Sequence, residues 1–263
     1  MGVVNVTPDS FSDGGCFADH ETAIAHGRRM ATEGADWVDV GGESTRPGAV
    51  AVDDDVELER VLPVIEALAA DGIRVSVDTR KERVARAAVA AGARLLNDVG
   101  ASLGHVAADL GVPWAVMHAQ GDPATMQDDP TYRDVVSEVR DHLVAKAEAA
   151  LNAGVPEVWI DPGIGFGKTH DHNLSLLAHL DELVATGHPV LVGTSRKGFI
   201  GAILGRSDGT NAPVPVDDRL EGSLATATWA MAMGARMVRV HDVRATVHAA
   251  RVVAGELIKD AAA

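Results

Sequence analysis

A single (β/α)8 barrel (TIM barrel, α/β class) over residues 1–263 is the fold that the sequence predicts, and three observations support this prediction. Eight short apolar runs recur along the chain, seven glycines stand between them, and no Ser/Pro-rich linker divides the sequence. Such a barrel forms one domain of about 250 residues, so a chain of 263 residues does not require a second domain.

The eight apolar runs are predicted to be strands. They are short, mostly β-branched and apolar at consecutive positions, which is typical of strands buried on both faces of a parallel sheet. The runs are Val3–Val6, Trp37–Val40, Arg74–Val77, Leu95–Val99, Trp114–Met117, Val158–Ile160, Val190–Val192 and Met237–Val240.

The segments between the runs are predicted to be helices. Two of them repeat apolar residues at the spacing of one helix face: Val84, Ala87, Ala88 and Ala91, and, approximately, Val243, Val247, Ala250, Ala254 and Leu257. A glycine follows each helical segment and precedes the next run, as is common where helices end. These glycines are Gly34, Gly72, Gly92, Gly111, Gly154, Gly187 and Gly234.

The connections between strands differ in length. Residues 7–19, 41–55 and 194–219 form long, polar, Gly- and Pro-rich connections after the first, second and seventh strands. Barrel active sites are built from loops of this kind at the carboxyl ends of the strands. By contrast, segment 100–113 is so short that we expect a helix of only about two turns, near Leu103–Leu110.

Two alternative nucleotide-binding interpretations fail on the residues present. An open doubly wound sheet needs a glycine-rich turn after its first strand, where this chain has Thr7-Pro8-Asp9. In segment 163–168, a P-loop would require glycine at Pro162, and a dinucleotide motif would require glycine at Lys168. We therefore exclude both.

Polar side chains close nearly every predicted strand. A barrel gains no stability from them, because buried carboxylates and amides cost several kcal/mol unless they are paired. Asp78, Asn97 and Asp161 supply carboxylates and an amide, which suit a flat heterocycle with several N–H donors. A second group of amide, guanidinium and imidazole side chains suits phosphate oxygens with Mg²⁺. The polar positions are Asn5, Asp39, Asp78, Asn97, His118, Asp161, Thr194, Ser195, Arg196, Lys197, Arg239, His241 and Asp242.

Composition limits the class of partner. The 38 Asp and Glu residues exceed the 23 Lys and Arg residues, so the formal net charge is −15. A field of this sign repels polyanions and argues against a nucleic-acid or anionic-membrane binder, and no apolar run approaches the roughly 20 residues of a membrane span. One cysteine, Cys16, cannot form an internal disulfide, and the first residues lack the features of a signal peptide. We therefore expect a cytoplasmic protein.

Two long motifs resemble the signatures of the dihydropteroate synthase family. They are Asn5–Gly15 (Asn-Val-Thr-Pro-Asp-Ser-Phe-Ser-Asp-Gly-Gly) and Asp39–Gly48 (Asp-Val-Gly-Gly-Glu-Ser-Thr-Arg-Pro-Gly). Six shorter matches follow in the order found in the family: Ser76–Thr79, Asn97–Val99, Met117–His118, Asp161–Lys168, Ser195–Lys197 and Arg239–Asp242. The resemblance covers residues 2 to about 255.

The resemblance implies a reaction and a role for each residue. The family condenses (7,8-dihydropterin-6-yl)methyl diphosphate with 4-aminobenzoate to give 7,8-dihydropteroate and diphosphate, and we expect the diphosphate to leave before the amine attacks. Catalysis is assigned to Asp78, Asp161, Lys197 and Arg239, and pterin binding to Asp78, Asn97, Met117, Asp161, Phe166 and Lys197. Diphosphate binding is assigned to Asn5, Arg46, Arg239 and His241, with Mg²⁺ on Asn5, and 4-aminobenzoate binding to Phe11, Thr45, Pro47 and Ser195. Sulfonamide mimics of 4-aminobenzoate are expected to inhibit.

Other interpretations stay open at this stage. A pterin-dependent methyltransferase would read the same ring but has no use for a diphosphate clamp, and a catalytically silent pterin-binding paralogue would be expected to have lost a rim residue. For Lys197, contact with the pterin ring is favoured over a role as a Schiff-base lysine. For His118, a packed position is favoured over a catalytic role. Apolar residues near the eighth strand (Trp229, Met231 and Met233) indicate a homodimer.

Overall fold

The computed structural model describes residues 1–7, 15–44, 51–121 and 125–255, and these form alternating strands and helices. All eight predicted strands are present, each within two residues of its predicted ends. They are β1 Gly2–Asn5, β2 Val38–Gly41, β3 Val75–Asp78, β4 Leu95–Asp98, β5 Trp114–Met117, β6 Val158–Asp161, β7 Leu191–Val192 and β8 Met237–Val238.

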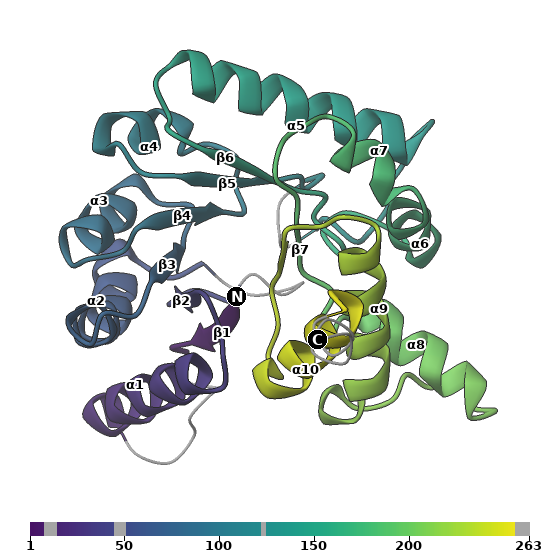
Figure 1. Cartoon of the computed structure of the whole chain (residues 1–263), viewed down its shortest axis with the longest axis horizontal. Helices are drawn as coiled ribbons and strands as arrows, with labels where there is room; N and C mark the ends of the chain where they lie inside the picture. The colour runs from purple at the N-terminus through teal and green to yellow at the C-terminus, as the bar shows by residue number, and fades with distance from the viewer. Residues whose placement is uncertain (8–14, 45–50, 122–124, 256–263) are drawn as a thin grey trace, which may run out of the picture.

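The strands form a closed parallel barrel. β1 to β6 pair with one another in chain order, and β7 pairs with β8. Single parallel bridges join Ile160 to Val190 and Gly2 to Val240, and they connect the two sheets at both edges. Figure 1 shows the helices in a ring around these strands, with α1 to α5 following one another in chain order. The predicted (β/α)8 architecture is therefore confirmed.

Most predicted helix features are also present. All seven predicted glycines have positive φ values, between 63° and 115°, a conformation that glycine adopts without steric cost. The short helix expected near Leu103–Leu110 is α4. The helices are α1 Gly15–Thr32, α2 Asp54–Ala70, α3 Glu82–Ala90, α4 Gly104–Leu110, α5 Val135–Asn152, α6 His170–Ala178, α7 Leu180–Val184, α8 Gly198–Ser207, α9 Leu220–Ala232 and α10 Val243–Val253, with a short 3₁₀ helix at Val216–Asp218.

The helix after the seventh strand begins three residues beyond Ser195. α8 begins at Gly198 with Lys197 as its N-cap, because Arg196 has a φ of 60° and turns the backbone before the helix. Two residue contacts hold this turn: Asp242 accepts two hydrogen bonds from the Arg196 guanidinium, and Arg219 donates to the Arg196 carbonyl. The turn presents Ser195 and Lys197 to the barrel mouth.

Two apolar layers support the barrel. One lies between the strands and the surrounding helices. The other fills the lower barrel interior and contains Met1, Leu95, Ala115, Leu191 and Met237. Because side chains alternate along a strand, the residue two positions after each of these points into the same interior at a higher level. Asn97, Met117, Gly193 and Arg239 occupy those positions after Leu95, Ala115, Leu191 and Met237, and Val3 occupies the one after Met1. Strand geometry therefore brings four residues of different strands to one end of the barrel interior.

Candidate active site at the carboxyl ends of the strands

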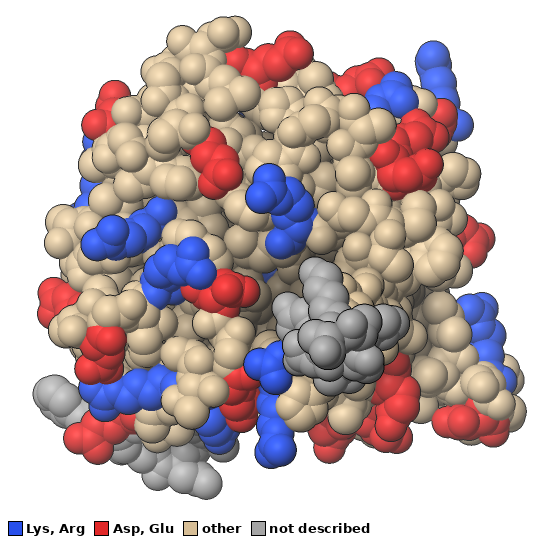
Figure 2. Space-filling model, in the orientation of Figure 1, with Lys and Arg blue, Asp and Glu red and all other residues tan. Residues whose placement is uncertain are grey.

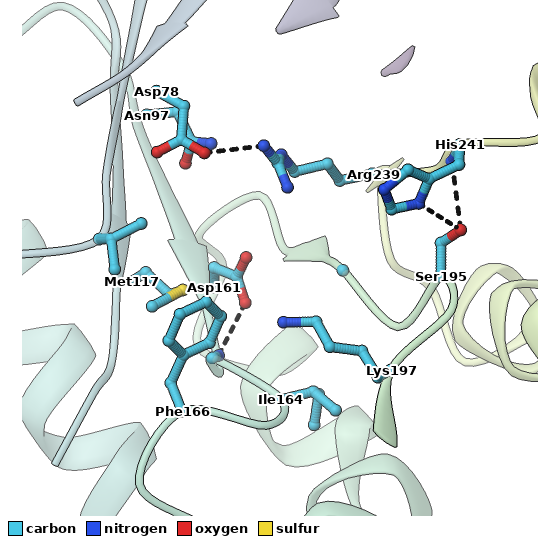
Figure 3. A pocket seen from close by; sticks show the side chains of 13 residues that line it. Asp78, Asn97, Met117, Asp161, Ile164, Phe166, Ser195, Lys197, Arg239 and His241 are labelled. Atoms are coloured by element: carbon cyan, nitrogen blue, oxygen red, sulfur yellow. Dashed lines mark hydrogen bonds and ion pairs between the residues drawn. The ribbon is translucent and has the colours of Figure 1, made fainter. Parts of the chain in front are cut away.

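A pocket with about 480 Å³ of empty volume opens at the carboxyl ends of the strands. Nine of the fourteen predicted site residues line it, and Figure 3 shows most of its side chains converging from different strand ends. The lining residues are Asp78, Asn97, Val99, Met117, Asp161, Gly163, Ile164, Phe166, Gly193, Ser195, Lys197, Arg239 and His241. Val99, Gly163, Ile164 and Gly193 were not predicted, because apolar residues and glycines carry no chemical signal in a sequence.

The other five predicted residues are not among the lining residues that the structure describes. Phe11, Thr45, Arg46 and Pro47 lie outside the described residues. Asn5 ends β1 in register with Gly41, which is itself in register with Asp78. Asn5 therefore stands at the same level of the barrel as Asp78, two strands away.

Arg239 forms an ion pair with two carboxylates. Its Nε donates to Asp39 Oδ2 at 2.6 Å, and its Nη2 donates to Asp78 Oδ2 at 2.7 Å. The second bond is drawn in Figure 3. Asp39 is fully buried, and its Oδ2 also accepts a hydrogen bond from Asn97 Nδ2 at 2.9 Å. The sequence analysis placed Asp39 among the strand-end polar residues but assigned it no role in the site.

The protonation of Asp78 depends on this cluster. Burial raises the pKa of Asp78 to about 7, while Arg239 acts in the opposite direction. Asp39 adds to the rise because it places a second negative charge beside the same guanidinium. The charged state of Asp78 thus depends on the guanidinium of Arg239.

Asp161 and Lys197 face each other across the pocket. Figure 3 shows the Lys197 amine pointing toward the Asp161 carboxylate, and Lys197 Nζ lies 4.0 Å from the centre of the Phe166 ring. Burial raises the pKa of Asp161 to about 6, and burial lowers the pKa of Lys197 to about 8 although Asp161 favours its charged form. Asp161 Oδ1 accepts a hydrogen bond from Gly163 N at 2.7 Å, which leaves its other oxygen for a ligand.

Ser195 and His241 form a third part of the site. Their side chains are joined by a 3.0 Å hydrogen bond between Ser195 Oγ and His241 Nδ1, and His241 N donates to Ser195 Oγ at 3.1 Å. Ser195 was predicted to bind 4-aminobenzoate and His241 to bind diphosphate, and the structure brings the two residues together. A hydroxyl, an imidazole and the nearby Arg239 thus form one donor-rich side of the pocket.

Lys168 and His118 form a buried pair behind the pocket. Lys168 Nζ contacts His118 Nδ1 at 2.9 Å and donates to the carbonyl oxygens of His118 and Phe166 at 3.1 and 3.0 Å. All three ammonium hydrogens therefore have acceptors. Burial lowers the pKa of His118 to about 3 and that of Lys168 to about 7. His118 is a packed, hydrogen-bonded histidine, as predicted.

Gly163 allows the loop after β6 to approach β5 closely. Its φ is +63°, and a Cβ added there would lie 1.8 Å from the His118 carbonyl oxygen. We expect Gly163→Ala to lower the free energy of unfolding by at least about 3 kcal/mol, because the substitution adds a backbone collision to left-handed strain. Urea unfolding checks this against Gly187→Ala, where φ is +85° and an added Cβ meets no described atom within 4 Å. Equal losses in the two variants would contradict the collision.

Surface charge and helix composition bear on whether the described part of the chain could bind a polyanion or cross a membrane. Figure 2 shows Lys and Arg side chains interspersed with Asp and Glu on the face in view, without a continuous basic stripe. Among the helices that the structure describes, none is long and apolar enough to span a membrane.

The chain is similar to proteins of known family. The family model described as pterin binding enzyme matches residues 1–241. The dihydropteroate synthase of Mycobacterium leprae (strain TN) is 49% identical over 261 residues, which cover 96% of this chain and 91% of the relative.

Solved structures agree with this match. Xanthomonas albilineans dihydropteroate synthase with 4-aminobenzoic acid has a TM-score of 0.89 and 50% identity, covering 98% of this chain and 92% of its own. Yersinia pestis dihydropteroate synthase in a sulfonamide drug complex has a TM-score of 0.89 and 43% identity, covering 98% of this chain and 94% of its own. Both similarities extend over the strands that carry the pocket.

Proposed function

The chain belongs to the dihydropteroate synthase family of pterin binding enzymes, and on that premise we propose how its pocket carries out the reaction. The enzyme is a transferase of folate biosynthesis that joins (7,8-dihydropterin-6-yl)methyl diphosphate to 4-aminobenzoate and releases diphosphate. The observation that carries the proposal is the convergence of carboxylate and amide oxygens on one side of the pocket and cationic donors on the other.

The pterin ring is bound by the oxygen-rich side. Asp161, Asp78 and Asn97 offer acceptors that match the amino group and ring N–H groups of a dihydropterin. Met117 and Phe166 line the slot, and Lys197 reaches the ring from the turn after β7. Buried acceptors that need donors reject a ring lacking them, often by factors of about 10⁴.

Diphosphate is bound by the donor-rich side. A guanidinium has five N–H donors, and the two ion pairs of Arg239 use one on Nε and one on Nη2. Three donors of Arg239 thus remain for an anion, beside His241. Arg46, which lies outside the described residues, is proposed as a further ligand.

Mg²⁺ is the proposed cofactor, with Asn5 as its protein ligand. Mg²⁺ prefers oxygen ligands and usually binds through few protein groups together with substrate phosphates and water. In the described part of the chain, no group of three His, Cys, Asp or Glu side chains could hold a metal without substrate. The amide oxygen of Asn5 fits this requirement, since β1 lies beside β2 and is bridged to Val240, next to Arg239 and His241. When bound, Mg²⁺ would neutralise charge on the diphosphate.

The chemical step is a substitution at the methylene carbon. The bond from this carbon to a diphosphate oxygen breaks, and its electron pair stays on the oxygen. The amine of 4-aminobenzoate then forms the C–N bond with its lone pair and releases a proton to solvent. Asp78 and Asp161 stabilise the positive charge that develops on the pterin, and Arg239 and His241 stabilise the departing anion. The amine is already nucleophilic, so the proposal contains no general base.

The 4-aminobenzoate site is proposed at Ser195, with Phe11, Thr45 and Pro47 from segments outside the described residues. We expect a sulfonamide drug to compete with 4-aminobenzoate, because the Y. pestis relative is described in complex with one. Initial rates should show a raised apparent KM for 4-aminobenzoate and an unchanged maximal rate. A full rate at low 4-aminobenzoate with excess sulfonamide would contradict this site.

The proposed oligomeric state is a homodimer, and the proposed location is the cytoplasm. Trp229 on α9 is half exposed, although its Nε1 donates to the Leu177 carbonyl at 2.7 Å. Met233 packs against the core instead, so it gives no support to a dimer. The cytoplasmic assignment rests on the single cysteine.

Turnover tests the proposed function. Purified protein is mixed with Mg²⁺, the dihydropterin diphosphate and 4-aminobenzoate, and dihydropteroate and diphosphate are followed together. We expect equal amounts of the two products, and none from the Asp161→Ala variant. Tight binding of the dihydropterin diphosphate without turnover would instead indicate a silent paralogue.

A further inference from the structure

Asp39 lies directly beneath the pocket and is not part of its lining. It is in β2, two residues before Gly41, and Gly41 is in register with Asp78 of β3. Since side chains alternate along a strand, Asp39 points into the barrel interior one layer below Asp78. Its side chain is fully buried. Asp39 therefore acts on the pocket only through other residues.

The contacts of Asp39 determine how Asn97 presents its amide. Asp39 Oδ2 contacts the Asn97 amide nitrogen at 2.9 Å. An ionised carboxylate only accepts hydrogen bonds, so the –NH₂ group of Asn97, rather than its oxygen, must face Asp39. The oxygen of Asn97 is then left for the pocket that Asn97 lines.

The same carboxylate oxygen fixes Arg239. It accepts from Arg239 Nε at 2.6 Å, while Arg239 Nη2 reaches Asp78 at 2.7 Å. With Nε held by Asp39 and Nη2 held by Asp78, the planar guanidinium of Arg239 has one orientation at the pocket that it lines. One buried oxygen thus orients both an acceptor and a donor of the substrate site.

We propose that Asp39 is a positioning residue that sets the hydrogen-bonding pattern of the pocket: it turns the Asn97 oxygen toward the pterin and holds Arg239 against Asp78. The proposal deepens the proposed function and rests on it. With Asp39 in place, Asp78, Asn97 and Asp161 all present oxygens, so the pocket selects rings with several N–H donors on their edge. Without Asp39, Asn97 can turn its –NH₂ group toward the pocket, where it would face the N–H donors of the ring and form no hydrogen bond with them.

Asp39 also affects the charge state of Asp78. Burial is the largest cause of the raised pKa of Asp78, and four charged groups act with it: Arg239 and Lys197 lower the pKa, and Asp39 and Glu57 raise it. A neutral residue at position 39 removes one negative charge and leaves Arg239 to Asp78 alone. Both changes lower the pKa of Asp78.

The variant Asp39→Asn tests the proposal. We expect the KM for the dihydropterin diphosphate to rise at least tenfold, with the KM for 4-aminobenzoate changed less than twofold. We also expect the rise of kcat/KM with pH to move to lower pH, because loss of the charge at position 39 lowers the pKa of Asp78. Ionisation of the substrate is the same for both proteins, so it does not contribute to the difference.

Asp98→Asn is the matched control. Asp98 is also a fully buried carboxylate, but it faces the helix layer and accepts from the backbone of Ser102 and Leu103 and from Trp114 Nε1. We expect Asp98→Asn to lower Tm without moving either KM or the pH profile. If Asp39→Asn behaves in the same way, Asp39 is only structural and the proposal is wrong.

An exchanged pair keeps the proposal testable if Asp39→Asn folds poorly. Asn97→Asp alone sets two carboxylates against each other, whereas Asp39→Asn combined with Asn97→Asp restores an amide facing a carboxylate and an oxygen facing the pocket. We expect the double variant to bind dihydropterin diphosphate at least fivefold more tightly than Asn97→Asp. No recovery would overturn the proposal. Calorimetric binding of this compound needs no turnover, so failure of the proposed function, in which the wild type binds but does not react, is recognised separately.

Discussion

Asp161→Asn is expected to remove nearly all turnover and at the same time to stabilise the folded protein. Asp161 Oδ1 accepts from Gly163 N, and the oxygen of an asparagine can replace it there. The amide –NH₂ would then face the pocket, where a dihydropterin also presents donors. Two donors that face each other leave both unpaired, so we expect kcat/KM for the dihydropterin diphosphate to fall about 10³-fold.

The gain in stability follows from the pKa of Asp161. Burial raises this pKa from its ordinary value of 3.8 to about 6, so the folded state holds a proton that the unfolded state has lost between these values. Stability therefore falls as pH rises from about 4 to 6, and the full penalty, about 3 kcal/mol, is present above pH 6. Asparagine carries no such penalty.

Urea unfolding of the ligand-free proteins measures this effect. We expect Asp161→Asn to be more stable than the wild type by about 1–3 kcal/mol at pH 7.5 and to be equal to it near pH 3.5, where the wild-type carboxyl is protonated in both states. An increase in stability that persists at pH 3.5 would assign the effect to packing instead of charge.

The same conflict between folding and function extends over the site. Burial raises the pKa of Asp78 and lowers the pKa of Lys197, so each of these charges is harder to maintain in the folded protein than in the unfolded chain. Ligand binding relieves part of this cost, because a pterin and a diphosphate supply the missing partners. We infer that substrates stabilise the protein substantially.

The barrel could be predicted from the sequence because its signals are local. Each strand is a short apolar run, and several rim residues follow an interior apolar residue by two positions, as Asn97 follows Leu95 and Arg239 follows Met237. The seventh and eighth strands came out shorter than predicted. Val190 and Val240 belong to the predicted strands, but each forms only a single bridge, to Ile160 of β6 and to Gly2 of β1. A single bridge is not a continuous ladder of hydrogen bonds, so neither residue extends its strand.

The role of Asp39 could not be predicted in this way. Its partner Arg239 is 200 positions away, and the two meet only because the first and last strands close the barrel. Lys168 is a similar case: in the sequence it completes a glycine-rich segment that looks like a phosphate loop, yet the structure buries it against His118. Side-chain type and spacing identify the chemistry at a strand end, but pairing across the barrel depends on the closed fold.

Arg239→Met is expected to cause the largest loss of stability of any single change at the site. Methionine has nearly the length of the arginine stem, so the volume is roughly kept while Asp39 and Asp78 lose their common cation. Two buried carboxylates without a partner should cost about 3–5 kcal/mol, and turnover should be lost because the diphosphate loses three donors. The matched control is Arg140→Met: Arg140 also pairs with two acids, Asp141 and Glu182, but at the surface, where such pairs contribute at most about 1 kcal/mol.

A triple variant separates the two effects of Arg239. Adding Asp39→Asn and Asp78→Asn to Arg239→Met removes the unpaired charges, so we expect urea unfolding to recover most of the lost stability. Activity should not recover, because the diphosphate still lacks its donors. Recovery of both would show that Arg239 serves only the fold, and recovery of neither would show that the ion pair is not what stabilises this layer of the barrel. The proposed mechanism requires stability to return without activity, since one guanidinium neutralises the acidic layer below and binds the anion above.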